Sequence, residues 1–167
     1  MVVTSPRCWL GRCEPVADDP PRLLPPTGPA EEYRSRLMAA PFAVLATHGP
    51  DQRLDLVPCC FALDDELGPV ELVTAVDHKP KRHKRLARLT NIGVNPNVTL
   101  LVDHRHPDDW SDLWWIRVHG LARVVEAGSE HESAVAALVA KYAQYRDQAP
   151  AGAVIRIVPQ RWAGWSP

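Results

Sequence analysis

A short run of basic residues carries the strongest chemical signal in this sequence. Six lysines and arginines lie within the eleven residues 78–88, HKPKRHKRLAR, together with two histidines and no acidic residue. The whole chain has a formal net charge of −1, so the residues outside this run carry −7 between them. Clustered positive charge raises the local concentration of anions. The run therefore predicts a site for a polyanion: nucleic acid, a phosphorylated cofactor or a cofactor with an acidic tail.

Nucleic acid is the partner that this pattern favours least. Proteins that bind single strands without sequence preference place aromatic side chains among their basic residues, so that bases can stack on them. The run 78–88 contains no Phe, Tyr or Trp. The acidic remainder of the chain would also repel a long phosphate backbone. We therefore expect no binding to nucleic acid.

Other reactive residue types do not combine into a recognisable site. His104 and His106 lie near three aspartates, but the loop that holds them is rich in Pro and Asp, and their spacing fixes no third ligand, so no metal site is predicted. The four cysteines lack C-x-x-C spacing and are expected to be reduced thiols. Neither a G-x-S-x-G nucleophile motif nor a phosphate-binding glycine loop is present. The sequence thus assigns no catalytic residue.

Length and composition favour one ordinary globular domain. A chain of 167 residues can bury an adequate core. No apolar run approaches the roughly 18 residues that cross a bilayer, and the amino terminus lacks the apolar centre of a signal peptide. We therefore expect a cytoplasmic protein with no membrane partner. Residues 1–28 hold six of the seventeen prolines, which predicts an extended or disordered tail before a domain at 29–167.

The periodicity of apolar and β-branched residues predicts the elements of this domain. The expected strands cover 42–48, 54–63, 70–76, 97–103, 113–126 and 153–159, and the expected helices cover 30–40, 80–90 and 130–146. Pro58 cannot donate to a ladder, so the second strand should lie at an edge or be bulged there. Six strands with short connections predict a mainly β fold with flanking helices (α+β), a small closed or half-open barrel.

These elements give the basic run a position. It follows the third strand directly, and Pro80 suits the first turn of a helix. A helix that starts there would offer free N–H groups and a positive dipole end to an anion. Arginine adds a planar fork and lysine a flexible point charge. We expect the first half of the run, Lys79 to Arg82, to hold the anion, and the later charges Lys84 and Arg88 to be solvated surface.

Four segments, in their order and spacing, resemble one known superfamily. They are VPCCFAL (57–63), VDHKPKRHKRLARLTNIGVNPNVTLLVDH (76–104), DWSDLWWIRVHGLARVVE (109–126) and RWAGW (161–165). Together they resemble the split β-barrel flavin and deazaflavin oxidoreductases, which include pyridoxamine 5'-phosphate oxidase. The combination of K-P-K-R, L-x-N-I-x-x-N-P and D-W-x-x-L-W-W-x-R-V-x-G is most similar to an actinobacterial branch of coenzyme F420-dependent enzymes. The resemblance covers about residues 31–167 and leaves out the proline-rich tail.

The resemblance implies a six-stranded split β-barrel that forms a homodimer and holds its cofactor in a groove between the two barrels. Coenzyme F420 carries a phosphate and a chain of glutamates, so its tail is a polyanion. In similar proteins, the second and third strands and the basic residues after the third strand hold the cofactor. The matching residues here are Val57, Pro58, Cys59, Thr74, Ala75, Val76, Lys79, Lys81, Arg82 and Asn91.

Two aromatic residues and three histidines are further candidates. Trp114 and Trp115 are adjacent, so on a strand they point to opposite faces. We favour one in the barrel core and the other in the dimer interface. In the alternative, Trp115 and Arg117, which share a face, line the substrate pocket. His48, His78 and His119 are unranked candidates for a proton donor.

The implied activity is hydride transfer between coenzyme F420 and a small, planar, unsaturated organic substrate. In such enzymes the cofactor supplies the chemistry and the protein positions it, which agrees with the missing nucleophile motif. Two alternatives remain open. One is an FMN-dependent oxidase of the pyridoxamine 5'-phosphate oxidase type, and the other is a non-catalytic split-barrel protein that carries or senses a flavin or haem.

Overall fold

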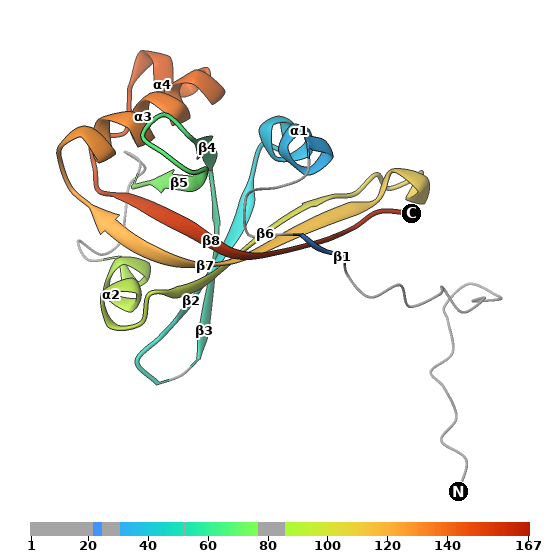
Figure 1. The fold of residues 1–167 in the computed structure, drawn as a ribbon, viewed down its shortest axis with the longest axis horizontal. Coiled ribbons are helices and arrows are strands. Elements are labelled where there is room, and N and C mark those ends of the chain that lie inside the picture. Colours follow the sequence, from blue (N-terminus) through green and yellow to red (C-terminus); the bar gives the residue numbers. More distant parts are fainter. Residues whose placement is uncertain (1–21, 25–30, 52, 77–85) are drawn as a thin grey trace, which may run out of the picture.

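The computed structural model describes residues 22–24, 31–51, 53–76 and 86–167. Its elements in chain order are β1 (Arg22–Leu24), α1 (Glu31–Ala39), β2 (Ala43–His48), β3 (Leu54–Cys59), β4 (Ala62–Asp64), β5 (Glu71–Ala75), α2 (Ala87–Val94), β6 (Asn97–His104), the 3-10 helix η1 (Trp110–Asp112), β7 (Trp114–Val125), α3 (Ser129–Lys141), α4 (Gln144–Asp147) and β8 (Val154–Trp165). Long strands form the centre of the molecule, and α3 and α4 lie together beside β4 and β5 (Figure 1). The fold is mainly β with flanking helices, as predicted.

All described strands belong to one sheet. Its order is β3-β2-β6-β7-β8-β5-β4, and each neighbouring pair is antiparallel. The short strand β1 also pairs with β8, so that Arg22–Leu24 in the proline-rich segment adopts the extended form. The sheet has eight strands, and the expected number of six is therefore wrong. One added strand is β1, and the other arises because the predicted strand 54–63 forms two strands.

The break in that strand lies at Cys60 and Phe61, and it organises the barrel. Before the break β3 pairs with β2, and after it β4 pairs with β5. At the break, the backbone N–H of Phe61 donates to the Tyr142 hydroxyl (2.9 Å), whose own hydrogen faces the carbonyls of Phe61 (2.9 Å) and Pro41 (2.8 Å). One distant side chain thus replaces the missing ladder partners. Because no ladder in the described chain joins β3 to β4, these consecutive strands form the two ends of an unclosed sheet.

Alternation along the strands separates a core face from an outer face. In β2, β6 and β7 every second residue is buried, and examples are Leu45, Leu100 and Ile116. Helix α1 closes one side of this core. Its Tyr33 ring lies about 2.7 Å from where a Cβ on Gly164 would stand, so only glycine lets α1 approach β8 this closely. The carboxy-terminal Trp162 is fully buried in the same core.

Three predicted boundaries need correction. The expected helix 80–90 is observed as α2, Ala87–Val94, and Leu86 before it has an extended backbone (φ −82°, ψ 125°). The stripe of Leu86, Leu89 and Ile92 predicted a helical face but not where the helix begins. The expected helix 130–146 ends at Lys141, after which α4 is a separate short helix. The last strand continues well beyond 159, to Trp165. Pro58 does lie on an edge strand, as predicted.

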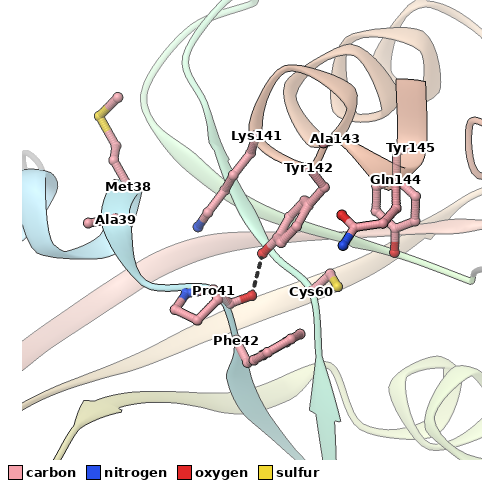
Figure 2. Close-up of a pocket in the computed structure, with 10 residues that line it drawn as sticks. All are labelled: Met38, Ala39, Pro41, Phe42, Cys60, Lys141, Tyr142, Ala143, Gln144 and Tyr145. Carbon is pink, nitrogen blue, oxygen red and sulfur yellow. Dashed lines mark hydrogen bonds between the residues drawn. The ribbon is translucent and has the colours of Figure 1, made fainter. Parts of the chain in front are cut away.

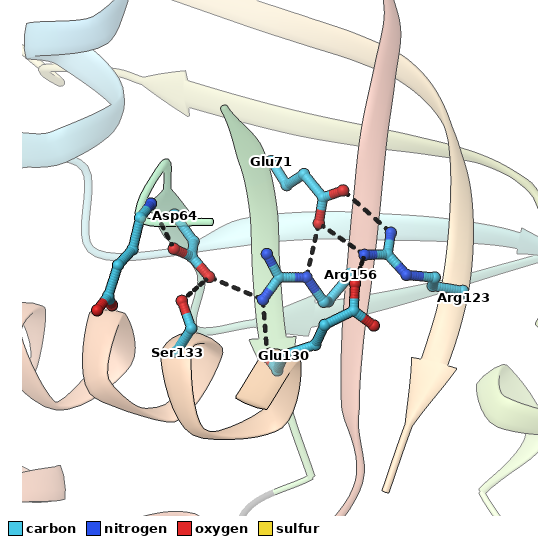
Figure 3. Close-up of polar contacts among 7 residues, drawn as sticks. Asp64, Glu71, Arg123, Glu130, Ser133 and Arg156 are labelled. Atoms are coloured by element: carbon cyan, nitrogen blue, oxygen red, sulfur yellow. Dashed lines mark hydrogen bonds and ion pairs between the residues drawn. The ribbon is translucent and has the colours of Figure 1, made fainter. Parts of the chain in front are cut away.

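A buried ionic network joins α3 to the sheet (Figure 3). Arg156 on β8 is only 3% exposed, and its guanidinium donates to Asp64 (2.7 Å), Glu71 (2.6 Å) and the backbone carbonyl of Glu130 (2.7 Å). Ser133 also donates to Asp64 (2.6 Å). Arg123, nearer the surface, bridges Glu71 and Glu130. These bonds satisfy Arg156 on both sides, so we interpret the cluster as structural.

Within the described part of the chain, no helix is long and apolar enough to cross a membrane.

Candidate functional site

The structure brings the predicted residues of the second and third strands together. Val57, Pro58 and Cys59 form the last half of β3, while Thr74 and Ala75 end β5. These strands are not sheet neighbours, yet the Cys59 thiol lies within interaction distance of the Thr74 hydroxyl. Burial raises the pKa of the Cys59 thiol, so it is uncharged at neutral pH. We call this contact, with Val76 after it, the β3–β5 junction.

The basic run follows this junction in the sequence and ends at Arg88, in the first turn of α2. Lys79, Lys81 and Arg82, on which the anion prediction rests, lie outside the described residues, as does His78. Arg88 in the first turn of α2 is described, and it is half-buried rather than solvated surface. Its positive charge acts to lower the pKa of Cys59 against the effect of burial. Val76, shortly before the run in sequence, belongs to the β3–β5 junction, and Arg88, the last residue of the run, lies near Cys59.

Asn91 holds α2 against the sheet, and its predicted contact with a cofactor stays a prediction. Its side chain is buried (2% exposed), and its amide donates to the hydroxyl of Thr47 (3.0 Å) and the carboxylate of Asp55 (2.8 Å). Both donor hydrogens are thus used inside the chain, to hold α2 against β2 and β3. Only the side-chain oxygen is left for a cofactor. The L-x-N-I motif singled out Asn91 as a candidate site residue, but it did not predict that the amide of Asn91 points to the sheet.

We expect Asn91→Ala to lower the free energy of unfolding by about 1–3 kcal/mol, because buried polar partners lose their hydrogen bonds. Urea unfolding measures this loss. Asn97→Ala, at an exposed position, is the control, with a change within about 0.5 kcal/mol. A variant at Asn91 that unfolds like the unchanged protein and loses only cofactor affinity would contradict the structural role.

Trp114 and Trp115 point to opposite faces, as predicted. Trp114 is 9% exposed and packs in the core. Trp115 lies on the outer face, where the Arg117 guanidinium stands 5.5 Å from the centre of its ring. Both line a hollow of about 310 Å³ with Asp103 and Arg105. The Arg117 Nε is buried and has no hydrogen-bond partner in the described chain. The substrate-pocket role of Trp115 and Arg117 stays a prediction.

Two of the three candidate histidines lie together on the same outer face. His48 and His119 line a small hollow of about 180 Å³. The Nδ1 of His119 and the Thr99 hydroxyl are hydrogen bonded (2.9 Å). Burial, with smaller effects of Arg117 and Arg161, lowers the pKa of His119, so its ring is neutral at pH 7. A neutral imidazole is a poor acid at this pH, which argues against His119 as the proton donor.

One further cavity was not predicted from the sequence. It encloses about 470 Å³ between α1, Cys60 and the end of α3 (Figure 2). Its most polar wall residue is Lys141, whose amine is half-buried. The only signal for it was a lysine among tyrosines near the end of the expected helix 130–146. Among the described residues, no group of three His, Cys, Asp or Glu side chains could hold a metal ion.

The family comparison decides the class of protein. A family model described as pyridoxamine 5'-phosphate oxidase matches residues 29–166. The chain belongs to the pyridoxamine 5'-phosphate oxidase family. The superfamily resemblance is therefore confirmed, and with it a flavin-binding split-barrel family that includes oxidases. The narrower F420-dependent branch stays a prediction. No protein of curated function matches this chain in sequence.

Solved structures of similar fold agree with this family. A conserved hypothetical protein of Mycobacterium tuberculosis has 19% identity and a TM-score of 0.65, over 84% of this chain and 86% of the other. A proposed pyridoxamine 5'-phosphate oxidase of Listeria innocua has 21% identity and a TM-score of 0.59, over 82% and 98%. A proposed 5-nitroimidazole antibiotic resistance protein of Bacteroides thetaiotaomicron has 12% identity and a TM-score of 0.61, over 86% of each chain. At these identities the likeness concerns the fold.

The residues at the β3–β5 junction fit a cofactor with a flavin-like ring and an anionic tail. Within the described chain β3 pairs only with β2, so its other edge leaves backbone N–H and C=O groups for the heteroatoms of a ring. Pro58 contributes only a carbonyl to that edge. Val57, Ala75 and Val76 are half-buried apolar surface, and the Arg88 guanidinium supplies a cation near Cys59.

Proposed function

We propose that this chain is a coenzyme F420-dependent oxidoreductase that works as a homodimer on small unsaturated organic substrates. The observation that carries the proposal is the position of the basic run. A run of six lysines and arginines, without an aromatic residue, follows β5 in the sequence, and its last member, Arg88, lies near Cys59. This arrangement suits a cofactor whose ring lies against the strands and whose polyanionic tail extends along the cations.

When bound, the deazaflavin would supply the hydride, and the chain has to orient it. The free edge of β3 would bind polar atoms of the ring, while Val57, Ala75 and Val76 exclude water from its face. Lys79, Lys81 and Arg82 would bind the phosphate and the glutamate chain. Holding both reactants in a fixed orientation supplies much of the rate enhancement in a transfer of this kind. Arg117, which lines the Trp115 hollow, could orient a polar group of the substrate.

The outer face of the sheet supports the homodimer. Leu54 and Leu56 on β3 are 56% and 62% exposed. Ala46 on β2 lies directly opposite Leu56, and Val44, two residues along β2 and opposite Pro58, points to the same face; both are half-exposed. Leu101 on β6 continues this surface. A contiguous apolar face on a sheet is favourable to bury, and a second copy of the chain is the partner that the family resemblance implies. Size-exclusion chromatography with light scattering tests this assembly.

The proposal is tested by a cofactor titration of purified full-length protein. We expect saturable quenching of the F420 fluorescence in the micromolar range or below, and weaker binding of FMN. The protein would then reduce members of a panel of enones and nitroaromatics in the presence of reduced F420. The nitroaromatic arm is suggested by the name of the Bacteroides structure, a nitroimidazole resistance protein.

Each alternative corresponds to a different result. The family match itself favours FMN as the second candidate cofactor. A yellow protein that binds FMN tightly and F420 not at all would overturn the F420 assignment in favour of an oxidase. Tight cofactor binding with no turnover of any substrate in the panel would instead favour a non-catalytic flavin or haem carrier. Including haem in the titration distinguishes a flavin carrier from a haem carrier.

A further inference from the structure

The cavity in Figure 2 has the size and composition of a small-molecule site. Its volume of about 470 Å³ lies within the range of about 300–1,000 Å³ that is usual for ligand pockets. Met38 and Phe42 form an apolar rim on the α1 side, and Ala143 lies opposite them beside α4. Both Met38 and Phe42 are more than half exposed, so their apolar surface has no cover within the described chain.

The polar groups of this cavity are few, and one of them is already engaged. The Tyr142 hydroxyl is held by the backbone of Phe61 and by the Pro41 carbonyl. Lys141 is the cation of the site, and Gln144 lies on the other side of Tyr142 (Figure 2). The described lining residues include no aspartate or glutamate. A ligand would therefore meet apolar walls with a single positive charge.

Lys141 has no carboxylate partner among the described residues. Its amine donates to the Leu37 carbonyl (2.9 Å) and stands 3.7 Å from the centre of the Phe61 ring. An ammonium group has three donor hydrogens, so at least one is left for a ligand. Burial lowers the pKa of Lys141 to about 8, which means that its charge is poorly compensated. A bound anion would supply the missing counter-charge.

We propose that this cavity binds a small apolar molecule with one anionic group, a monocarboxylate, whose carboxylate pairs with Lys141. A phosphate or a dicarboxylate fits less well, because the cavity offers one cation and no arginine fork. A neutral ligand would leave the buried cation uncompensated. This site lies beyond the proposed cofactor function, since none of its lining residues belongs to the cofactor set.

The test uses cofactor-free full-length protein, so it does not depend on the F420 assignment. 3-Phenylpropanoate and its neutral amide, 3-phenylpropanamide, are titrated by calorimetry. We expect the carboxylate to bind at least about ten-fold more tightly, the factor that corresponds to one charge-assisted hydrogen bond. Lys141→Met should abolish this preference and Lys141→Arg should keep it. Arg146→Met, which removes an exposed cation from α4 outside the cavity, is the matched control.

A second variant and a pH series keep the test independent of folding effects. Ala143→Trp, at an exposed position of the wall, should block binding without a change in melting temperature. The carboxylate preference should decline as the pH rises past about 8, because Lys141 loses its charge. Cys60, Tyr142 and Tyr145 also line the cavity and carry groups that lose a proton at alkaline pH. The pH series is therefore repeated with the Cys60→Ser variant. No saturable binding at millimolar concentrations, equal affinity for acid and amide, or binding unaffected by Ala143→Trp would overturn the proposal.

Discussion

Replacing Arg156 with methionine is expected to lower the free energy of unfolding by about 3–5 kcal/mol, the range for removal of one partner from a buried ion pair. The Asp64 side chain is 2% exposed and would lose its cation inside the protein, while Glu71, whose side chain is 15% exposed, would keep only the partly exposed Arg123. The backbone carbonyl of Glu130 would lose a donor as well. Chemical unfolding in urea, followed by circular dichroism, measures the loss.

Arg123→Met is the control from the same network. Arg123 also pairs with Glu71, but its side chain is 38% exposed, so solvent screens its charge. We expect a loss of about 1 kcal/mol or less. Asp64→Asn added to Arg156→Met should recover part of the larger loss, since it removes the buried charge that Arg156→Met leaves unpaired. Equal effects of Arg156→Met and Arg123→Met would contradict the buried network.

The same network predicts a loss of stability in acid. Burial by itself would raise the pKa of Asp64, but hydrogen bonds from Ser133, the backbone N–H of Glu66 and Arg156 outweigh it and hold the pKa below its ordinary value. A group whose pKa is lower in the folded state stabilises the protein above its unfolded-state pKa of about 4. That contribution is lost as the pH falls from about 4 through the folded-state value. Asp64→Asn should flatten this part of the profile.

The sequence predicted best what depends on local alternation. Apolar periodicity located all six expected strands, and proline chemistry placed Pro58 on an edge. The adjacent pair Trp114 and Trp115 showed that one face of β7 is core and the other is not. These predictions hold because a strand fixes the direction of each side chain relative to its neighbours.

The features that the sequence missed depend on contacts between distant residues. The break at Cys60 and Phe61 exists where Tyr142, some eighty positions away, replaces the ladder. The Asn91 amide points to Thr47 and Asp55 because α2 packs on β2 and β3, which its motif does not encode. Lys141 becomes an unusual cation only through burial against Phe61. The start of helix α2 at Ala87 was not predicted, because periodicity shows which face of a helix is apolar and does not show where the helix begins.

The junction explains why a basic run on an acidic protein would select a cofactor rather than a long polymer. The run follows β5 in the sequence, and its last residue, Arg88 in α2, lies near Cys59. The apolar strand edge beside it suits a planar ring, while nucleic acid would need a longer cationic track.

The alanine triple variant Lys79→Ala, Lys81→Ala, Arg82→Ala is expected to weaken F420 binding by about 100-fold, the effect of losing several partly screened charge-assisted contacts. The loss should grow with the number of glutamates in the F420 tail, because each added carboxylate meets the same cations. Affinity should also depend less on salt in the variant. A triple variant with the same charge change at exposed positions elsewhere, Arg53→Ala, Arg146→Ala, Arg161→Ala, should bind within a few-fold of the unchanged protein. Fluorescence titration with short-tailed and long-tailed F420 measures both. An affinity that ignores tail length and these three residues would mean that the run binds a different anion.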